Sequence, residues 1–148
     1  MKAGKTITIC SSAVFFRKAL KIEKKLKAFG FRVKLPHTAQ KMKQSGDFKV
    51  ETYKTWFKNK KDYAKKRWLI TNHFRKVISS DAILVVNEKK NGIEGYIGGN
   101  TLMEMAIAFQ YKKPIYILNP VSEKLGWKEE VFGMQPIFLN GVLEKIAL

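Results

Sequence analysis

A single carboxylate, Glu104, stands among apolar residues near the start of a predicted helix, and it is the residue best placed for chemistry. A glycine-containing stretch over residues 92–99 precedes it, and Asn100 or Thr101 can cap the helix. A helix that follows a parallel strand begins at the carboxyl edge of the sheet, where open α/β sheets bind ligands. A carboxylate in the first turn there faces a cleft that can take a sugar or a phosphate. The alternative is a solvent-facing glutamate that only favours the helix dipole.

Two hydroxyls form a second candidate site, since Ser11 and Ser12 follow a strand that ends at Cys10 and precede a helix. Hydroxyls and free N–H groups at a helix start favour phosphate, although a simple serine cap explains them equally. His37 directly follows the next strand, on the same edge of the sheet, as a structural or a catalytic residue. Neither GxGxxG nor GxxxxGK[ST] occurs, so dinucleotide and P-loop sites are not supported.

Two strand–helix–strand units must position these side chains, because crossovers of this length join parallel strands. Residues 36–50 are expected to be a long loop, and a break is expected in the following helix near Asn59. The order predicts a flavodoxin-like or Rossmann-like three-layer α/β sandwich with about five parallel strands, in one domain over residues 1–148. Strands are expected over 5–10, 31–35, 82–86, 115–118 and 136–139, and helices over 14–29, 51–78, 101–111, 122–131 and 142–146.

Composition limits the classes of function. One cysteine rules out an internal disulfide, and two histidines without HExxH-type spacing give nothing like a zinc cluster. We therefore expect no metal ion and no cofactor. No apolar run has the length of a membrane span, and the amino end lacks a signal peptide's apolar core. A cytoplasmic protein without membrane contact is expected.

The charge is strongly positive, with 29 Lys+Arg against 12 Asp+Glu and a net charge of +17. Such an excess attracts polyanions, and weak non-specific binding of nucleic acid is one expectation. The densest stretch, residues 54–67, interleaves lysines with aromatic residues. A helix with a lysine-coated solvent face and an aromatic core face explains it, and so does a nucleic-acid surface. A basic proteome or an acidic small substrate explains the total charge as well.

Three segments in this order resemble the nucleoside 2-deoxyribosyltransferase superfamily, which includes the 2'-deoxynucleoside 5'-phosphate N-hydrolases. They are ITICSS in the first strand, LPHT after the second, and DAILVVN followed by GYIGGNTLMEMAIAFQYKKPIYILNP. The resemblance implies attack by Glu104, kept ionised by its first-turn position, on the anomeric carbon of a deoxyribose. It implies a homo-oligomer that completes each active site from a neighbour. Asn87 takes the place of an acidic residue that serves the base, so our catalytic candidates are Glu104 and Asn87. Expected substrate-binding residues are Cys10, Ser11, Ser12, His37, Asp81, Gly98, Gly99 and Asn100.

Departures from the superfamily keep two classes of function open. The first loop lacks the tyrosine that orients the nucleophile in the transferases, and Asn87 is not acidic. The first class is an enzyme that cleaves or transfers the N-glycosidic bond of a nucleoside or its 5'-monophosphate. The second is a non-catalytic nucleotide-binding or nucleic-acid-associated module on the same fold. The sequence does not determine which base is released, whether the sugar is ribose or deoxyribose, or whether water or a second base is the acceptor.

The helix that carries Glu104 is apolar on more than one side, which predicts a partner. A sheet covers only one stripe of a helix, so the surplus face is expected to pack on a second copy through Met103 and Ile107. The helix over 51–78 is the alternative cover and would leave a monomer.

Overall fold

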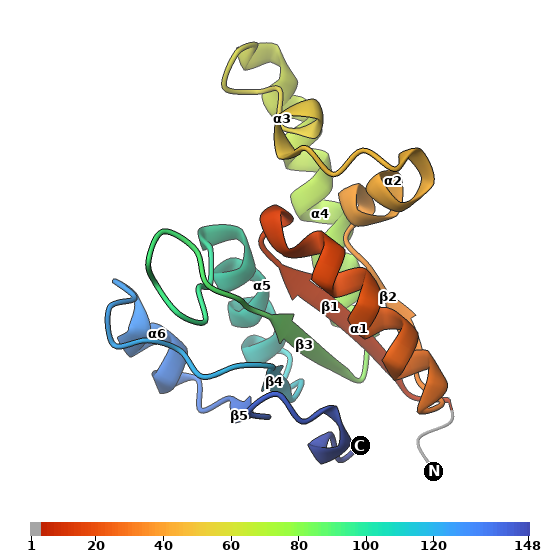
Figure 1. Cartoon of the computed structure of the whole chain (residues 1–148), viewed down its shortest axis with the longest axis vertical. Coiled ribbons are helices and arrows are strands. Elements are labelled where there is room, and N and C mark those ends of the chain that lie inside the picture. Colours follow the sequence, from red (N-terminus) through yellow and green to blue (C-terminus); the bar gives the residue numbers. More distant parts are fainter. Residues whose placement is uncertain (1–3) are drawn as a thin grey trace.

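A five-stranded parallel sheet forms the centre of the computed structural model, which describes residues 4–148. The strand order is β2-β1-β3-β4-β5, and each neighbouring pair is parallel. This arrangement confirms the predicted α/β fold (Figure 1). The strands are β1 (Thr6–Ser11), β2 (Arg32–Lys34), β3 (Ala82–Val86), β4 (Ile115–Ile117) and β5 (Ile137–Phe138).

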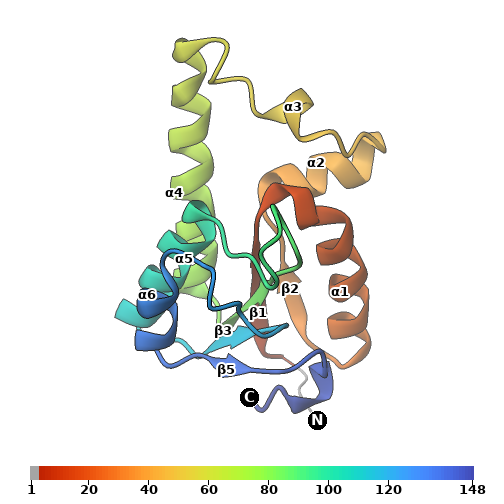
Figure 2. The same ribbon diagram turned by 60° about the vertical axis from the view of Figure 1, so that its left-hand side comes forward.

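Helices cover both faces of the sheet, as Figure 2 shows. One face is covered by α1 (Phe16–Ala28) and α2 (His37–Ser45), together with a terminal 3-10 turn at Leu143–Lys145. The other face is covered by α4 (Tyr63–Ser79), α5 (Gly99–Gln110) and α6 (Lys128–Gly133). The helix expected over 122–131 therefore begins later, at Lys128. No helix within residues 4–148 is long and apolar enough to cross a membrane.

The central strand β3 explains why the sheet has two cores. All five of its residues are buried, and successive side chains point to opposite faces. Leu84 and Val86 pack with α1, whereas Ile83 and Val85 pack with α5 and α6. An unbroken apolar run is thus the expected sequence for a strand covered on both sides.

The expected loop over 36–50 is wrong, because residues 37–45 form helix α2. Its inner face carries Ala39 and Met42, three residues apart and fully buried against the α1 side of the core. Gly46 ends the helix with φ 75°, a left-handed conformation that glycine adopts without strain. With only two apolar positions, α2 has too weak a periodicity to stand out from a polar loop.

The helix expected over 51–78 is divided, and the predicted break near Asn59 is confirmed. A short helix, α3 (Val50–Tyr53), is followed by irregular chain and a 3-10 turn, Lys60–Asp62, before α4 begins. Asn59 caps that turn by accepting a hydrogen bond from the backbone N–H of Lys61 at 3.2 Å. We call residues 46–62 the arch, since they pass from α2 to the far end of α4 (Figures 1 and 2).

Hydrogen bonds from its own side chains stabilise the arch. The Tyr53 hydroxyl donates to the backbone oxygen of Asp47 at 2.7 Å, and the Thr55 hydroxyl donates to Asp62 at 2.6 Å. Trp56, in the middle of the arch, is buried. The aromatic and lysine residues noted in the sequence therefore do not form one amphipathic helix, because the buried tryptophan belongs to the arch.

Candidate active site

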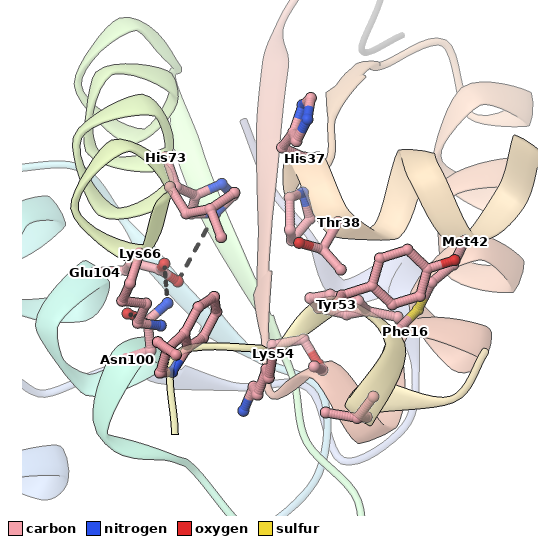
Figure 3. A pocket seen from close by; sticks show the side chains of 16 residues that line it. Phe16, His37, Thr38, Met42, Tyr53, Lys54, Lys66, His73, Asn100 and Glu104 are labelled. Atoms are coloured by element: carbon pink, nitrogen blue, oxygen red, sulfur yellow. Dashed lines mark hydrogen bonds and ion pairs between the residues drawn. The ribbon is translucent and has the colours of Figure 1, made fainter. Parts of the chain in front are cut away.

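A cavity of about 80 Å³ lies between the arch and helices α2, α4 and α5, beside the end of β1 (Figure 3). Its wall mixes aromatic, cationic and polar side chains around one carboxylate, Glu104. A wider hollow of about 530 Å³, lined by α2, the arch and α4, adjoins it and shares His37, Thr38, Tyr53, Trp56 and Leu69 with it. The cavity is lined by Ser11, Ala13, Phe16, Pro36, His37, Thr38, Met42, Val50, Tyr53, Lys54, Trp56, Lys66, Leu69, His73, Asn100 and Glu104.

Glu104 lies in the second turn of α5, not in the first as expected, because the helix already begins at Gly99. The residue is only 3% exposed, so the solvent-facing alternative is wrong. Asn100, one turn earlier, donates from Nδ2 to Glu104 Oε2 at 3.0 Å. Asn100 therefore does not cap the helix, whose N-cap is Gly98, but orients the carboxyl group.

Three buried side chains from three different elements meet at the floor of the cavity. Cys10 comes from β1, His73 from α4 and Glu104 from α5. His73 Nε2 lies 3.6 Å from Cys10 Sγ and 3.7 Å from Glu104 Oε1. Sequence reasoning placed Cys10 and Glu104 near the site but gave His73 no role.

His73 escaped notice because its neighbours gave a misleading pattern. Trp68 is a large aromatic residue, the type expected on a buried helix face, yet it is half exposed, and its ring packs edge-on against His37 with centroids 4.8 Å apart. The buried residues of α4 are His73 and Val77, one turn apart. The one available signal in the sequence was that His73 lies four positions before Val77, on the same face of the helix.

Burial sets the charge of this group. It raises the pKa of Glu104 to about 8, although a hydrogen bond with Cys10 and the charge of Lys66 act in the opposite direction. Burial and the charge of Lys76 lower the pKa of His73 to about 4. Burial, and then Glu104, raise the pKa of the Cys10 thiol well above its usual value. Burial therefore favours the neutral form of all three side chains, which runs against the expectation of an ionised Glu104.

Two lysines bring positive charge to the cavity wall. Lys66 on α4 donates from Nζ to Asn100 Oδ1 at 3.3 Å, and its Nζ lies 5.3 Å from the centre of the Trp56 ring. Lys54 enters from the arch (Figure 3). Burial is the main cause that lowers the pKa of both lysines. The charge of Lys54 further lowers the pKa of Lys66, and the charge of Lys90 further lowers the pKa of Lys54. Sequence reasoning noted this basic stretch but did not connect it with the site.

His37 opens helix α2 and lines the cavity, on the ligand edge of the sheet where it was expected. Its ring packs against Trp68, and burial and the charges of Lys41 and Lys76 lower its pKa. The structure thus brings His37 and Glu104 to the same cavity, on opposite walls (Figure 3).

The serines of the first loop take packing positions. Ser11 lines the cavity, but its hydroxyl donates to the backbone oxygen of Val86 at 2.7 Å. Ser12 lies against Gly98, where an added Cβ would come within 2.7 Å of the Ser12 Oγ. A Cβ on Gly99 would meet nothing within 4 Å. Gly98 therefore permits the first loop and the start of α5 to approach, whereas Gly99 is not confined in this way.

Asn87 and Asp81 lie outside the cavity wall, which corrects their assignment to the site. Asn87 Nδ2 donates to the backbone oxygens of Gly95 and Asn119 at 3.0 and 2.9 Å, and its Oδ1 accepts from Asn119 N at 2.9 Å. Its side chain thus joins two loops. Asp81 precedes β3, and its Oδ2 accepts from Thr6 N at 2.8 Å at the opposite end of the strands.

Comparison with known proteins supports the fold. No protein-family model matches the chain, and no curated protein matches it. Among solved structures, it is similar to a 2-deoxyribosyltransferase from the psychrotolerant bacterium Bacillus psychrosaccharolyticus. The TM-score is 0.53 at 15% sequence identity, over 83% of this chain and 78% of that chain. At this identity the likeness establishes a shared fold.

Proposed function

We propose that this protein cleaves or transfers the N-glycosidic bond of a deoxynucleoside or its 5'-monophosphate, with Glu104 as the nucleophile. The observation that carries the proposal is the position of Glu104, a buried carboxyl group that faces a cavity at the ligand edge of the sheet. The fold is shared with a 2-deoxyribosyltransferase, whose name describes the same class of reaction.

The chemistry proceeds in two displacements. Glu104 forms a bond to the anomeric carbon of the sugar while the bond from that carbon to the base nitrogen breaks, and the base leaves. Water or a second base then attacks the same carbon and releases the carboxylate, as in retaining glycosidases. Glu104 must lose the proton that burial stabilises as it attacks, and the departing base, which needs a proton on its nitrogen, takes it.

The cavity wall favours a 5'-monophosphate over a neutral nucleoside. Lys54 and Lys66 are half-buried cations that would meet a phosphate, and a charge-assisted hydrogen bond is stronger than a neutral one. Tyr53 and Trp56 offer flat apolar surface to a base. At about 80 Å³ the cavity itself is smaller than a typical ligand pocket. A nucleotide must therefore also occupy the adjoining hollow of about 530 Å³ or displace the arch.

Base release from a panel of deoxynucleosides and their 5'-monophosphates, followed by chromatography, tests the proposal. We expect release by the natural protein and none by Glu104→Gln. Glu23→Gln is a matched control, because Glu23 is also a buried glutamate but pairs with Lys27 and Lys43 on α1 and α2. Unchanged turnover in Glu104→Gln would rule the nucleophile out.

A further inference from the structure

The buried group of Cys10, His73 and Glu104 offers one sulfur, one nitrogen and one oxygen atom, all within 4.8 Å of one another. The three residues come from three different elements, β1, α4 and α5, and their ligand atoms are gathered at one place in the core. The cysteine is fully buried, and the other two residues are 4% and 3% exposed. His73 and Glu104 also line the cavity, which gives that point a route to solvent.

Two of the three distances match those between ligands of one tetrahedral ion, and the third is at most 4.8 Å. Zinc binds sulfur at about 2.3 Å and nitrogen or oxygen at about 2.0–2.2 Å, which sets neighbouring ligand atoms about 3.3–3.8 Å apart. The observed separations from His73 Nε2 are 3.6 Å to Cys10 Sγ and 3.7 Å to Glu104 Oε1. Both lie within that interval.

The donor set selects the kind of ion. Thiolate, imidazole and carboxylate together suit zinc and chemically similar borderline ions, whereas calcium and magnesium require oxygen ligands. Asn100 already donates to the other oxygen of Glu104, which is how an outer partner orients a ligating carboxylate. The nearby Lys66 works against a cation, and binding must release the protons of Cys10 and Glu104.

We propose that Cys10, His73 and Glu104 form a binding site for one Zn²⁺-class ion, with a fourth coordination position that opens to the cavity. Three protein ligands and one open position are the arrangement of zinc sites that accept a further ligand. An ion on Glu104 occupies the carboxylate, so metal and glycosidic chemistry exclude one another. That consequence alone depends on the proposed function; the binding of the ion does not.

Titration of the untagged, chelator-treated protein with Co²⁺ tests the site by its absorption spectrum. We expect a thiolate-to-cobalt charge-transfer band in the near ultraviolet and intense visible bands of a tetrahedral ion, saturating at one Co²⁺ per chain. Zn²⁺ should remove both sets of bands. Cys10→Ser should lose the charge-transfer band, and His73→Gln should weaken binding at least about tenfold. His37→Ala is the matched control, since His37 lines the same cavity outside the group.

Absence of a charge-transfer band in the natural protein at saturating Co²⁺ would overturn the site, and so would a band that persists in Cys10→Ser. Thermal unfolding without metal establishes that each variant is folded. The outcomes separate the two proposals: stoichiometric binding in a protein that releases no base removes the proposed function only. Base release without a cobalt spectrum removes the metal site only.

Discussion

Glu104 Oε1 and His73 Nε2 lie 3.7 Å apart, between two helices that pack side by side, α4 and α5. Burial acts on the two groups in opposite ways, since it favours the protonated acid and the unprotonated imidazole. Burial therefore favours a neutral pair in which Glu104 holds the proton. The effect of burial on these two pKa values should be visible in both the stability and the activity of the protein.

The first prediction concerns stability against pH in metal-free buffer. Glu104 holds its proton to about pH 8 in the folded chain but loses it near 4.5 when unfolded, so stability falls as pH rises through that interval. His73 has a folded pKa of about 4 against 6.5 unfolded, so its contribution rises with pH and is complete above 6.5. Between pH 6.5 and 8 the contribution of Glu104 remains.

Thermal melting across this interval should therefore show a falling melting temperature in the natural protein. Glu104→Gln should flatten the fall, because glutamine does not titrate. Cys10 ionises above this range, because burial raises the pKa of its thiol well above the usual value. An equally steep fall in Glu104→Gln would show that another group causes it.

The second prediction concerns the phosphate. If Lys66 meets a substrate phosphate, Lys66→Met should remove a charged hydrogen bond worth about 1.5–3 kcal/mol. KM for a deoxynucleoside 5'-monophosphate should then rise about 10- to 150-fold, with little change for the nucleoside. Lys61→Met is the control, because Lys61 is exposed and lines neither the cavity nor the neighbouring hollow. Equal effects on phosphate and nucleoside would contradict a phosphate contact.

The third prediction compares two adjacent glycines. Gly98→Ala should destabilise the protein by up to about 1 kcal/mol, because its Cβ would come within 2.7 Å of Ser12 Oγ and force that hydroxyl to rotate, and because alanine is a poorer N-cap than glycine. Gly99→Ala should be neutral or stabilising by up to about 1 kcal/mol, since its Cβ meets open space at the start of a helix. Chemical denaturation measures both values. Similar values for the two variants would mean that the first loop moves freely away from α5.

The fourth prediction is a dimer through the outer face of α5. The structure alters the expected contact, because Ile107 packs partly against the core while Met103 and Phe109 are 41% and 55% exposed. Although α4 packs beside α5, it leaves this face uncovered within the described residues. Light scattering at micromolar concentration should give twice 17.1 kDa, and Met103→Lys should reduce it to one chain. A mass of one chain for the natural protein would exclude the dimer.

Sequence reasoning recovered the sheet because its strands carry a strong local signal. The fully apolar run of β3 is the sequence that a strand buried on both faces requires. Gly30 follows α1 with a positive φ of 97°, a conformation that favours glycine. It missed α2, whose buried face consists of Ala39 and Met42 within a polar stretch. A short helix with two apolar positions has nearly the composition of a loop, and only packing against α1 distinguishes them.

The site was predicted less completely, because tertiary contacts decide it. Glu104 was found from its apolar neighbours, but its protonation depends on burial by tertiary contacts, which the sequence does not show. Asn87 and Asp81 were assigned by position in strand and motif, whereas their hydrogen bonds serve the backbone. His73 could not be found by spacing, since its partners Cys10 and Glu104 lie 63 and 31 positions away in the sequence.

A covalent intermediate is the most direct test of the central claim that Glu104 is a glycosidic nucleophile. The protein is mixed with a deoxynucleoside 5'-monophosphate, quenched with acid within the first turnover, and examined by intact-mass and peptide mass spectrometry. We predict a mass increase equal to one deoxyribose phosphate residue on the peptide that contains Glu104, and none in Glu104→Gln. Base release by Glu104→Gln at the natural rate, or an adduct on a peptide without Glu104, would contradict the account.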